Sequence, residues 1–232
     1  MKTIILSAGK STRLQPLTKN TPQSLLRVGQ KTIIEKQIDG LVQADIKKED
    51  ILVITGHLSD KLEKFCSGLG VETIFDPFYD VSGIAASLWS IRSEEKKGFL
   101  FLYSDVLFDP LIVKDLLAKN GDICLALKKD NPRAEAEKVI NEAGFIKEIG
   151  KTKLEMANSE FIGIAKFSSI GAEKFIKATE GLLKKSLAVS FINVVNSLIQ
   201  KGEIVTACDV GNSRFVDIDF PSDLERAIKF FN

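Results

Sequence analysis

The sequence predicts an α/β fold in which helices cover both faces of a mixed, mainly parallel β-sheet. Short apolar runs alternate along the chain with amphipathic stretches whose apolar residues recur at three- and four-residue spacing. The chain has 232 residues and 44% apolar side chains, which suffices for a sizeable core. No linker, repeat or low-complexity segment divides it, so we expect one domain over residues 1–232.

The first half of the chain alternates strictly between the two kinds of element. Buried strands are expected at residues 3–6, 51–55, 71–75, 99–103 and 123–127. Amphipathic helices are expected at residues 32–42, 59–67, 84–95 and 110–119. This order favours parallel strands joined by helical crossovers.

The order of elements changes after residue 130. Glu142-Ala143-Gly144 is typical of a turn between short strands, and residues 161–167 form another apolar run, so a mixed sheet edge is expected there. Further helices are predicted at residues 172–184, 190–201 and 222–230, and strands at 204–208 and 214–218. Ligands of such sheets bind beyond the carboxyl ends of the strands, so the loops after residues 6, 75, 103 and 218 are the candidates for a site.

Composition excludes several classes of protein. The 32 basic and 31 acidic side chains nearly cancel, so no net field favours a nucleic acid or a membrane surface, and we expect neither partner. Three widely spaced cysteines, Cys66, Cys124 and Cys208, define no disulfide framework and no metal motif, which favours reduced thiols. The apolar run at the N-terminus is too short for a signal peptide or a membrane span, so a cytoplasmic location is expected.

The loop after the first strand has the features of a phosphate-binding loop. Small residues around Gly9 let backbone N–H groups approach phosphate oxygens, and Arg13 adds a forked positive charge. The tetrapeptide Gly9-Lys10-Ser11-Thr12 is not a Walker P-loop, because that motif needs glycine where Ile4 stands and a helix where Pro16 stands.

A longer segment resembles the opening signature of the sugar-nucleotide and choline-phosphate nucleotidyltransferase family, with the cytidylyl branch most similar. It reads Leu6-Ser7-Ala8-Gly9-Lys10-Ser11-Thr12-Arg13-Leu14-Gln15-Pro16-Leu17-Thr18, followed by Thr21-Pro22-Gln23-Ser24-Leu25-Leu26-Arg27-Val28. The resemblance implies a Rossmann-like (GT-A-like) α/β/α sandwich. It also implies that the nucleotide is bound by Leu6, Ala8, Gly9, Lys10, Ser11, Thr12 and Arg13, with Arg13 taking part in catalysis.

Two residues depart from the family pattern. Ser11 replaces a second glycine, which requires a negative φ or a strained backbone. Gln23 replaces a lysine that contacts the transferring phosphate in the family, so this catalytic position has a hydrogen-bond donor without a charge. Losing such a cation typically costs about 2.7–4 kcal/mol of transition-state stabilisation. Lys10 or Lys19 could supply substitute charge; alternatively, both are solvated surface lysines.

Three carboxylates are candidates for a metal site. Asp105 ends an apolar strand, and Asp217 and Asp219 lie two residues apart in a strand-like run, which turns both to one side. The resemblance implies that Asp105 and Asp219 bind Mg²⁺, with Asp217 as neighbour, and hard oxygen ligands suit that ion. Asp109 precedes Pro110 and is expected to cap the following helix, as Ser222 is expected to cap the last one.

The acceptor side is implied by weaker matches. Residues 76–89 resemble a segment of the choline-phosphate branch in which an Asn pair stands where this chain has Ser82-Gly83. Ser82 and Ser87 are expected to contact the nucleotide, as is Asp105, and Lys151 is expected to bind the acceptor phosphate and assist catalysis. Glu160 is interpreted either as a ligand for a cationic headgroup or sugar hydroxyl, or as an exposed residue at the start of a strand. Trp89 is expected in the core, and the single histidine, His57, is interpreted as structural.

The resemblance and the residues together predict a Mg²⁺-dependent nucleotidyltransferase. It would transfer a nucleoside monophosphate, CMP first among them, from the triphosphate CTP to a phosphorylated small alcohol such as phosphocholine or inositol phosphate, releasing pyrophosphate. A sugar-1-phosphate nucleotidyltransferase is the alternative, as is an impaired, nucleotide-binding regulator in which Gln23 has replaced the family lysine. The base, the acceptor and the oligomeric state, a homodimer included, stay open.

Overall fold

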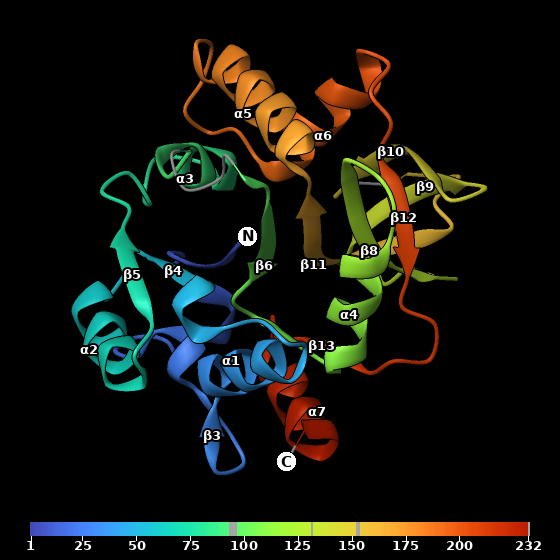
Figure 1. Cartoon of the computed structure of the whole chain (residues 1–232). Helices are drawn as coiled ribbons and strands as arrows, with labels where there is room; N and C mark the ends of the chain where they lie inside the picture. Colours follow the sequence, from blue (N-terminus) through green and yellow to red (C-terminus); the bar gives the residue numbers. More distant parts are fainter. Residues whose placement is uncertain (93–96, 131, 152–153, 232) are drawn as a thin grey trace. The chain divides into compact units, whose positions relative to one another are not determined.

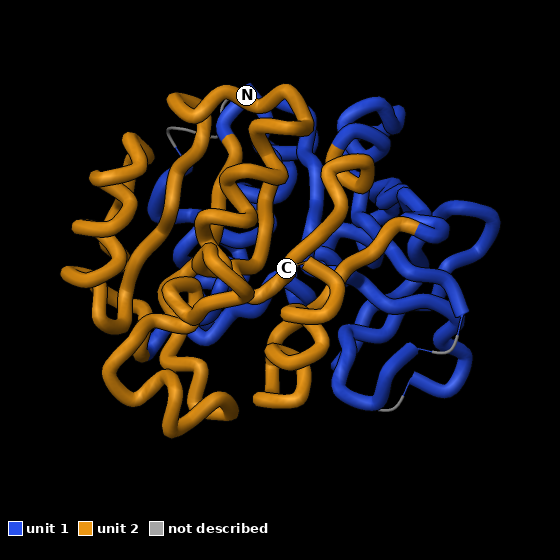
Figure 2. Tube along the Cα trace, turned by 90° about the horizontal axis from the view of Figure 1, so that it is seen from below, with its two compact units in different colours: residues 1–2, 81–100, 114–212 blue, residues 3–80, 101–113, 213–232 orange. Residues whose placement is uncertain are grey.

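A computed structural model describes residues 1–92, 97–130, 132–151 and 154–231 (Figure 1). The described residues form two compact units, and each unit is assembled from separate stretches of the chain. Unit 1 draws on residues 1–2, 81–100 and 114–212, and unit 2 on residues 3–80, 101–113 and 213–232 (Figure 2). The single domain expected over residues 1–232 stays a prediction.

Unit 2 is built on the parallel strands predicted for the first half of the chain. Its sheet has the strand order β5-β4-β1-β6, in which β1 pairs in parallel with β4 and β4 with β5. These strands are β1 (Lys2–Ser7), β4 (Ile51–Thr55), β5 (Glu72–Phe75) and β6 (Phe99–Tyr103). Two short antiparallel pairs accompany the sheet: β2 (Arg27–Val28) with β3 (Lys31–Thr32), and β7 (Val106–Phe108) with β13 (Phe215–Asp217).

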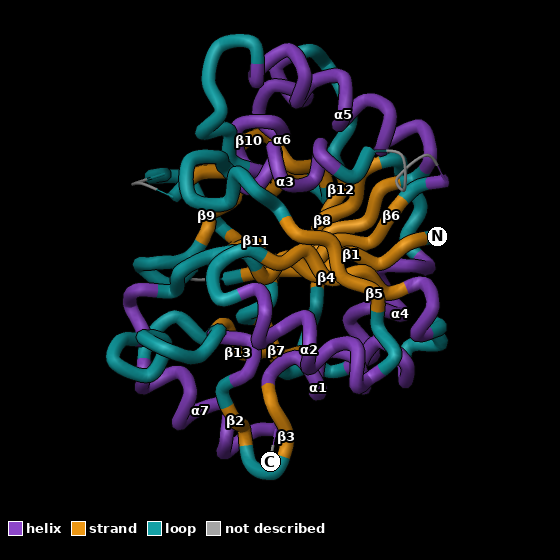
Figure 3. The backbone as a smooth tube through the Cα atoms, turned by 90° about the vertical axis from the view of Figure 1, so that its left-hand side faces the viewer, coloured by secondary structure: helices purple, strands orange, loops and turns teal. Residues whose placement is uncertain are grey.

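The helices of unit 2 begin and end where local chemistry dictates. Helix α1 (Ile33–Gln43) starts with a capping box, in which the Thr32 side chain accepts from the Glu35 backbone and the Glu35 side chain accepts from the Thr32 backbone. Helix α2 (Ser59–Leu69) stops at Gly70, whose φ of +72° is a left-handed conformation that glycine tolerates. Both helices lie on the same face of β1, β4 and β5 (Figure 3). Helix α4 (Pro110–Ala118) follows β7, and α7 (Pro221–Phe231) follows β13.

A hydrophobic cluster in unit 2 anchors the loops that follow β1 and β13. Leu14, beside Arg13, is 1% exposed, and Ile218, between Asp217 and Asp219, is fully buried. The other buried members are Leu26, Val28, Ile33, Leu107, Val216 and Ala227. The polar residues predicted for the site are therefore attached to backbone that is fixed by apolar packing.

Unit 1 contains a mixed sheet in which antiparallel pairs predominate. The strand order is β11-β8-β12-β10-β9, with β12 parallel to β8 and a further antiparallel pairing between β11 and β9. The strands are β8 (Ile123–Lys129), β9 (Glu137–Glu142), β10 (Phe145–Gly150), β11 (Ser159–Phe167) and β12 (Thr206–Asp209). Its helices are α3 (Ile84–Ser90), α5 (Ser169–Leu183) and α6 (Phe191–Gln200). The mixed sheet edge expected after residue 130 is confirmed.

Two helix boundaries differ from those expected by more than two residues. The helix predicted for residues 84–95 ends at Ser90, and residues 93–95 lie outside the described part of the chain. The helix predicted from residue 172 begins at Ser169, because the Ser168 side chain accepts a hydrogen bond from the Gly171 N–H and caps it earlier. The predicted turn between β9 and β10 is confirmed: Ala143 and Gly144 have φ of +51° and +89°, the signs that a two-residue hairpin loop requires.

Candidate active site

The loop after β1 is fastened to the body of unit 2 where it leaves the strand. The Ser7 hydroxyl, at the end of β1, donates to the buried Ser24 hydroxyl at 2.9 Å. The Ala8 carbonyl accepts from the His57 N–H at 3.0 Å, and a side chain on Gly56 would come within 2.6 Å of that same carbonyl oxygen. Gly9 has open space where a side chain would stand. The loop is thus held while its backbone at Gly9 stays accessible, as phosphate binding requires.

Of the two backbone conformations expected for Ser11, a negative φ or a strained one, the structure shows the strained one. Its φ is +47° and its ψ is 50°, in the left-handed region that costs a non-glycine residue about 1–2 kcal/mol. The Ser11 carbonyl accepts from the Thr18 hydroxyl at 2.8 Å and from the Leu14 N–H at 3.1 Å, and these bonds hold the turn. The serine therefore keeps a backbone shape suited to the glycine of the family pattern.

Asp105, Asp217 and Asp219 converge in unit 2, as the spacing predicts. Asp105 lies in the turn between β6 and β7, and Asp217 stands opposite Val106 in the β13–β7 pairing. The Ile218 N–H donates to the Asp105 carbonyl at 3.0 Å, which joins the two segments. One oxygen from each of the three carboxylates lies within 4.8 Å of the others.

The three carboxylates gather negative charge around Asp105. Burial, followed by the charges of Asp217 and Asp219, raises the pKa of Asp105 well above its usual range, and Arg13 opposes this effect. The Asp105 Oδ1 atom is buried and has no hydrogen-bond partner among the described residues. A hard divalent cation would supply both the missing charge and the missing partner, so the residues fit Mg²⁺.

Arg13 and Asp223 hold the end of the cluster at Asp219. An Arg13 Nη2–H donates to Asp219 Oδ1, and the Arg13 guanidinium lies 5.4 Å from the centre of the Phe220 ring. The Asp223 carboxylate accepts from the backbone N–H of Asp219 at 3.2 Å and of Phe220 at 2.9 Å. Asp223, in the first turn of α7, thereby fixes the loop that presents Asp219.

The cap expected at α7 is corrected by these contacts. Ser222 is exposed inside the first turn of α7, and Asp223 supplies the carboxylate that satisfies the N-terminal backbone. Proline at the first helical position, followed by an acidic residue in the first turn, is the signal that would have found it. The Asp109 carboxylate, directly before α4, accepts from the backbone N–H of Arg214 at 2.9 Å and from the Arg214 side chain at 3.1 Å, and its role as a cap stays a prediction.

Gln23, where the family has lysine, is hydrogen-bonded to the segment that carries Asp217 and Asp219. It is 9% exposed, and its Nε2–H donates to the carbonyl of Ile218, the residue between Asp217 and Asp219. At least one donor of this amide therefore serves the protein backbone. A direct contact of Gln23 with a phosphate stays a prediction.

The two lysines considered as substitutes for the missing charge differ in their surroundings. Lys10 Nζ lies 2.5 Å from Asp80 Oδ1, and this hydrogen bond raises the pKa of Lys10. Lys19 is exposed. Neither lysine side chain is buried. Because Lys10 is paired with Asp80, its ammonium group would have to break that contact before it could bind a phosphate.

The remaining nucleotide-site candidates belong to unit 1. A side chain on Gly83 would lie 2.2 Å from the Val189 carbonyl oxygen, and the Gly83 N–H donates to the Leu187 carbonyl at 2.9 Å. Glycine is therefore required there by close packing. Ser82 has a buried hydroxyl oxygen with no partner among the described residues, and Ser87 is 5% exposed.

The acceptor-site candidates lie on the sheet of unit 1. Lys151 is exposed, and its Nζ is 3.4 Å from Glu137 Oε1. The interpretation of Glu160 as an exposed residue is wrong: it is 4% exposed because β11 pairs with strands on both of its sides there. The Glu160 carboxylate accepts from the backbone N–H of Arg133 at 2.9 Å and from Arg133 Nε at 3.1 Å. Arg133, which the sequence did not single out, thus already neutralises the expected headgroup ligand.

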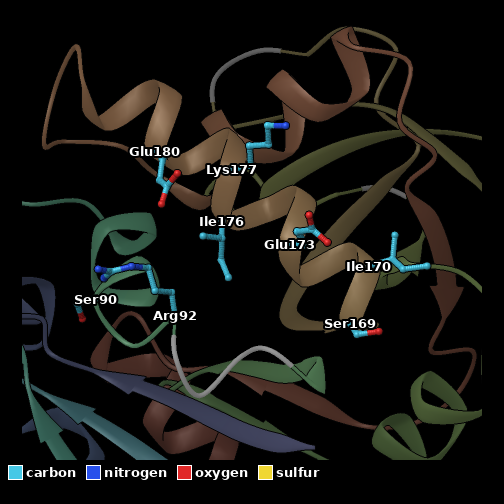
Figure 4. A pocket seen from close by; sticks show the side chains of 8 residues that line it. All are labelled: Ser90, Arg92, Ser169, Ile170, Glu173, Ile176, Lys177 and Glu180. Atoms are coloured by element: carbon cyan, nitrogen blue, oxygen red, sulfur yellow. The ribbon is translucent and has the colours of Figure 1, made fainter.

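Unit 1 contains a cavity of about 920 Å³, and none of its described lining residues is a predicted site residue (Figure 4). Arg92 lines it from the chain after α3, and Glu173, Lys177 and Glu180 line it from α5. Trp89, expected in the core, is only half-buried beside these residues, since its Nε1–H donates to Glu180 at 3.1 Å and Arg92 stacks on its ring at 3.9 Å. The lining carries both positive and negative side chains and defines no single ligand.

A loop of small residues after β1, an arginine beside it and converging carboxylates on an α/β scaffold define a nucleotidyltransferase. Comparison with known families gives the same result, because residues 3–159 match the model of the MobA-like NTP transferase domain. The chain belongs to that family.

Curated relatives include cytidylyltransferases. The CTP:phosphoglutamine cytidylyltransferase of Campylobacter jejuni is 27% identical over 99% of this chain and 100% of its own length. The choline-phosphate cytidylyltransferase of Streptococcus pneumoniae is 35% identical, but the match covers 50% of each chain. The bifunctional IPC transferase and DIPP synthase of Aquifex aeolicus is 25% identical over 98% of this chain, which spans only 51% of that longer protein.

Solved structures share the fold. The inositol-1-phosphate CTP transferase from T. maritima superposes with a TM-score of 0.83 at 23% identity, covering 99% of this chain and 96% of that one. The CTP:phosphocholine cytidylyltransferase from Streptococcus pneumoniae gives 0.80 at 22% identity, covering 100% and 99%. The Rossmann-like α/β architecture expected from the sequence is confirmed.

Within the described part of the chain, no helix is both long enough and apolar enough to cross a membrane.

Proposed function

We propose that this chain is a Mg²⁺-dependent cytidylyltransferase that transfers CMP from CTP to a phosphorylated small alcohol and releases pyrophosphate. The observation that carries the proposal is the convergence of Asp105, Asp217 and Asp219 beside Arg13, with the buried Asp105 Oδ1 lacking a partner among the described residues. The choice of CTP is supported by the cytidylyltransferases among the relatives, two of which act, by name, on phosphoglutamine and choline phosphate.

In this proposal the residues of unit 2 bind and neutralise the triphosphate. Backbone N–H groups around Gly9 face its oxygens, and Arg13, 53% exposed at its side chain, exchanges part of its contact with Asp219 for a phosphate. Asp105 and Asp219 would hold Mg²⁺, with Asp217 as neighbour, and the bound ion would supply positive charge at the phosphate oxygens. The acceptor's phosphate oxygen attacks the α-phosphorus in line, and no protein nucleophile or general base is needed.

For the acceptor we propose phosphocholine, inositol phosphate or a related phosphorylated alcohol, bound through Lys151 in unit 1. Lys151 is exposed and only loosely paired with Glu137, so its ammonium is available to an incoming phosphate. Glu160 contributes less directly, because Arg133 already occupies its carboxylate. A sugar 1-phosphate is the alternative acceptor, favoured by relatives such as the UTP–glucose-1-phosphate uridylyltransferase of Haloferax volcanii.

The test is pyrophosphate release from each of the four NTPs with a panel of phosphorylated alcohols and sugar 1-phosphates. CTP with a phospho-alcohol is expected to give the fastest Mg²⁺-dependent turnover, and Asp105→Asn is expected to abolish it. Turnover that the Asp105→Asn variant retains would contradict the metal assignment. A preference for UTP and glucose 1-phosphate would replace the proposed substrates by the alternative ones.

A second candidate function follows from Gln23. Because its amide bonds the Ile218 carbonyl and carries no charge, the chain could bind nucleotide and regulate a partner with little turnover of its own. We expect Gln23→Lys to raise turnover by two to three decades, the rate equivalent of about 2.7–4 kcal/mol of restored electrostatic stabilisation. The control is Gln23→Met, which removes the bond to Ile218 without adding charge and is expected to lower turnover. Equal rates for the unaltered chain and Gln23→Lys would show that the missing charge is supplied elsewhere.

A further inference from the structure

A buried glutamine on α1 makes contact with the turn that carries Asp105. The Gln37 side chain is fully buried, and its Nε2 lies 2.9 Å from the Tyr103 carbonyl oxygen and 2.8 Å from the Val106 carbonyl oxygen. These two carbonyls flank Ser104 and Asp105. One side chain therefore spans the turn from the side of the helix.

The chemistry of the amide identifies which end of Gln37 is in use. Backbone carbonyls only accept hydrogen bonds, and an amide nitrogen has two N–H donors, so each donor satisfies one carbonyl. The other end of the side chain, Oε1, is buried with no partner among the described residues. Burying the Gln37 amide with its Oε1 atom unsatisfied costs free energy. We therefore take the two hydrogen bonds donated by Nε2 as the role of this side chain.

Two backbone hydrogen bonds hold the turn from other directions. The Ser104 N–H donates to the Leu6 carbonyl of β1 at 3.2 Å, and the Asp105 carbonyl accepts from the Ile218 N–H at 3.0 Å. Gln37 adds two hydrogen bonds from α1, and the capping box of α1 fixes the N-terminal end of that helix. With this third contact, the backbone of Asp105 is restrained on three sides.

We propose that Gln37 is a positioning residue that orients Asp105 toward the cation. It touches neither substrate nor metal and acts through the Tyr103 and Val106 carbonyls. The inference rests on the proposed function, since it assumes that Asp105 binds a divalent ion. Residues that orient a metal ligand in this way typically change metal affinity by about 10- to 100-fold when they are mutated.

The variant that tests this is Gln37→Met, which keeps the length of the side chain and removes both donors. The dissociation constant for Mn²⁺, measured with the full chain by electron paramagnetic resonance with and without CTP, is expected to rise at least about tenfold. The Mg²⁺ concentration that gives half-maximal turnover is expected to rise in parallel, while KM for the acceptor stays unchanged.

Leu62→Ala is the matched control for stability. Leu62 is fully buried on α2, and its truncation destabilises unit 2 without touching the Asp105 turn. This variant is expected to unfold at lower temperature and to bind Mn²⁺ as the unaltered chain does. Loss of Mn²⁺ affinity in both variants would mean that destabilisation alone is responsible, and would overturn the inference.

Asp105→Asn separates failure of this inference from failure of the proposed function. If Asp105→Asn abolishes Mn²⁺ binding while Gln37→Met binds it normally, the metal site stands and Gln37 has no positioning role. If the unaltered chain and Asp105→Asn bind Mn²⁺ equally, or neither binds it, the metal assignment fails and this inference fails with it. Should Gln37→Met not fold, Gln37→Asn, whose amide is shorter by one methylene, is expected to show the same loss of Mn²⁺ affinity, and normal binding by it would overturn the inference.

Discussion

Single residues in unit 2 carry conformations and contacts that only one or two side-chain types support. Ser11 is held at a positive φ, and Gln23 and Gln37 use their amides on backbone carbonyls beside the carboxylates. Gln23 and Gln37 thereby fix the backbone of the segments that carry the carboxylates, and the Ser11 backbone fixes the turn after β1. The site therefore depends on residues that need not touch a ligand.

Ser11→Gly is expected to stabilise the protein. Glycine adopts φ of +47° without the steric cost that serine bears, and part of this gain is offset by the greater entropy of glycine in the unfolded chain. We expect the free energy of unfolding to rise by about 0.5–1 kcal/mol, measured by urea denaturation. The control is Thr12→Gly, at a neighbouring residue without a positive φ, which is expected to lower stability. A decrease for Ser11→Gly would contradict the strain inferred here.

Secondary-structure elements present the site through their ends. Strand β6 delivers Asp105, β13 delivers Asp217, and the start of α7 fixes Asp219 through Asp223. Element ends are where backbone groups lack partners within the element, so side chains that satisfy them also set the loop geometry.

Asp223→Ala is expected to destabilise α7 and the adjoining loop. The variant leaves the N–H groups of Asp219 and Phe220 without their acceptor, a loss of about 1 kcal/mol in the free energy of unfolding. Urea denaturation measures it, with Asp223→Asn expected to lose less because an acceptor oxygen remains. Ser222→Ala, the change at the cap expected from the sequence, should alter stability by no more than a few tenths of a kcal/mol. A larger effect at Ser222 than at Asp223 would reverse the assignment.

The features that could be predicted from the sequence are those that depend on residues close together in the chain. The strands, the loop around Gly9 and the three aspartates follow from apolar runs and from residue order at strand ends, which are properties of neighbouring residues. The burial of Glu160 depends on strands from both sides of β11, and the contacts of Gln37 join α1 to a turn more than sixty residues away. Such contacts are decided by tertiary packing, which one sequence does not reveal.

On the scale of the whole molecule, unit 2 is assembled from three stretches of chain. Its hydrophobic cluster takes Leu14, Leu26, Val28 and Ile33 from the first stretch, Leu107 from the second, and Val216, Ile218 and Ala227 from the third. No single stretch contains a complete core.

A fragment of residues 1–80 is therefore expected not to fold, although it contains the entire loop that resembles the family signature. Without Leu107, Val216, Ile218 and Ala227, the apolar side chains of the first stretch stay exposed. The fragment should show narrow amide proton dispersion by NMR and no cooperative urea transition, with the full chain as the control. A cooperative transition in the fragment would contradict this dependence.

The contact between Arg13 and Asp219 joins residues that are 206 positions apart. During translation the loop that contains Arg13 is made long before Asp217, Asp219 and α7. Until then, neither the carboxylate cluster nor the hydrophobic cluster beneath it can close. A nascent chain would expose the apolar side chains of that cluster until then, and a chain terminated before residue 213 would lack Asp217 and Asp219.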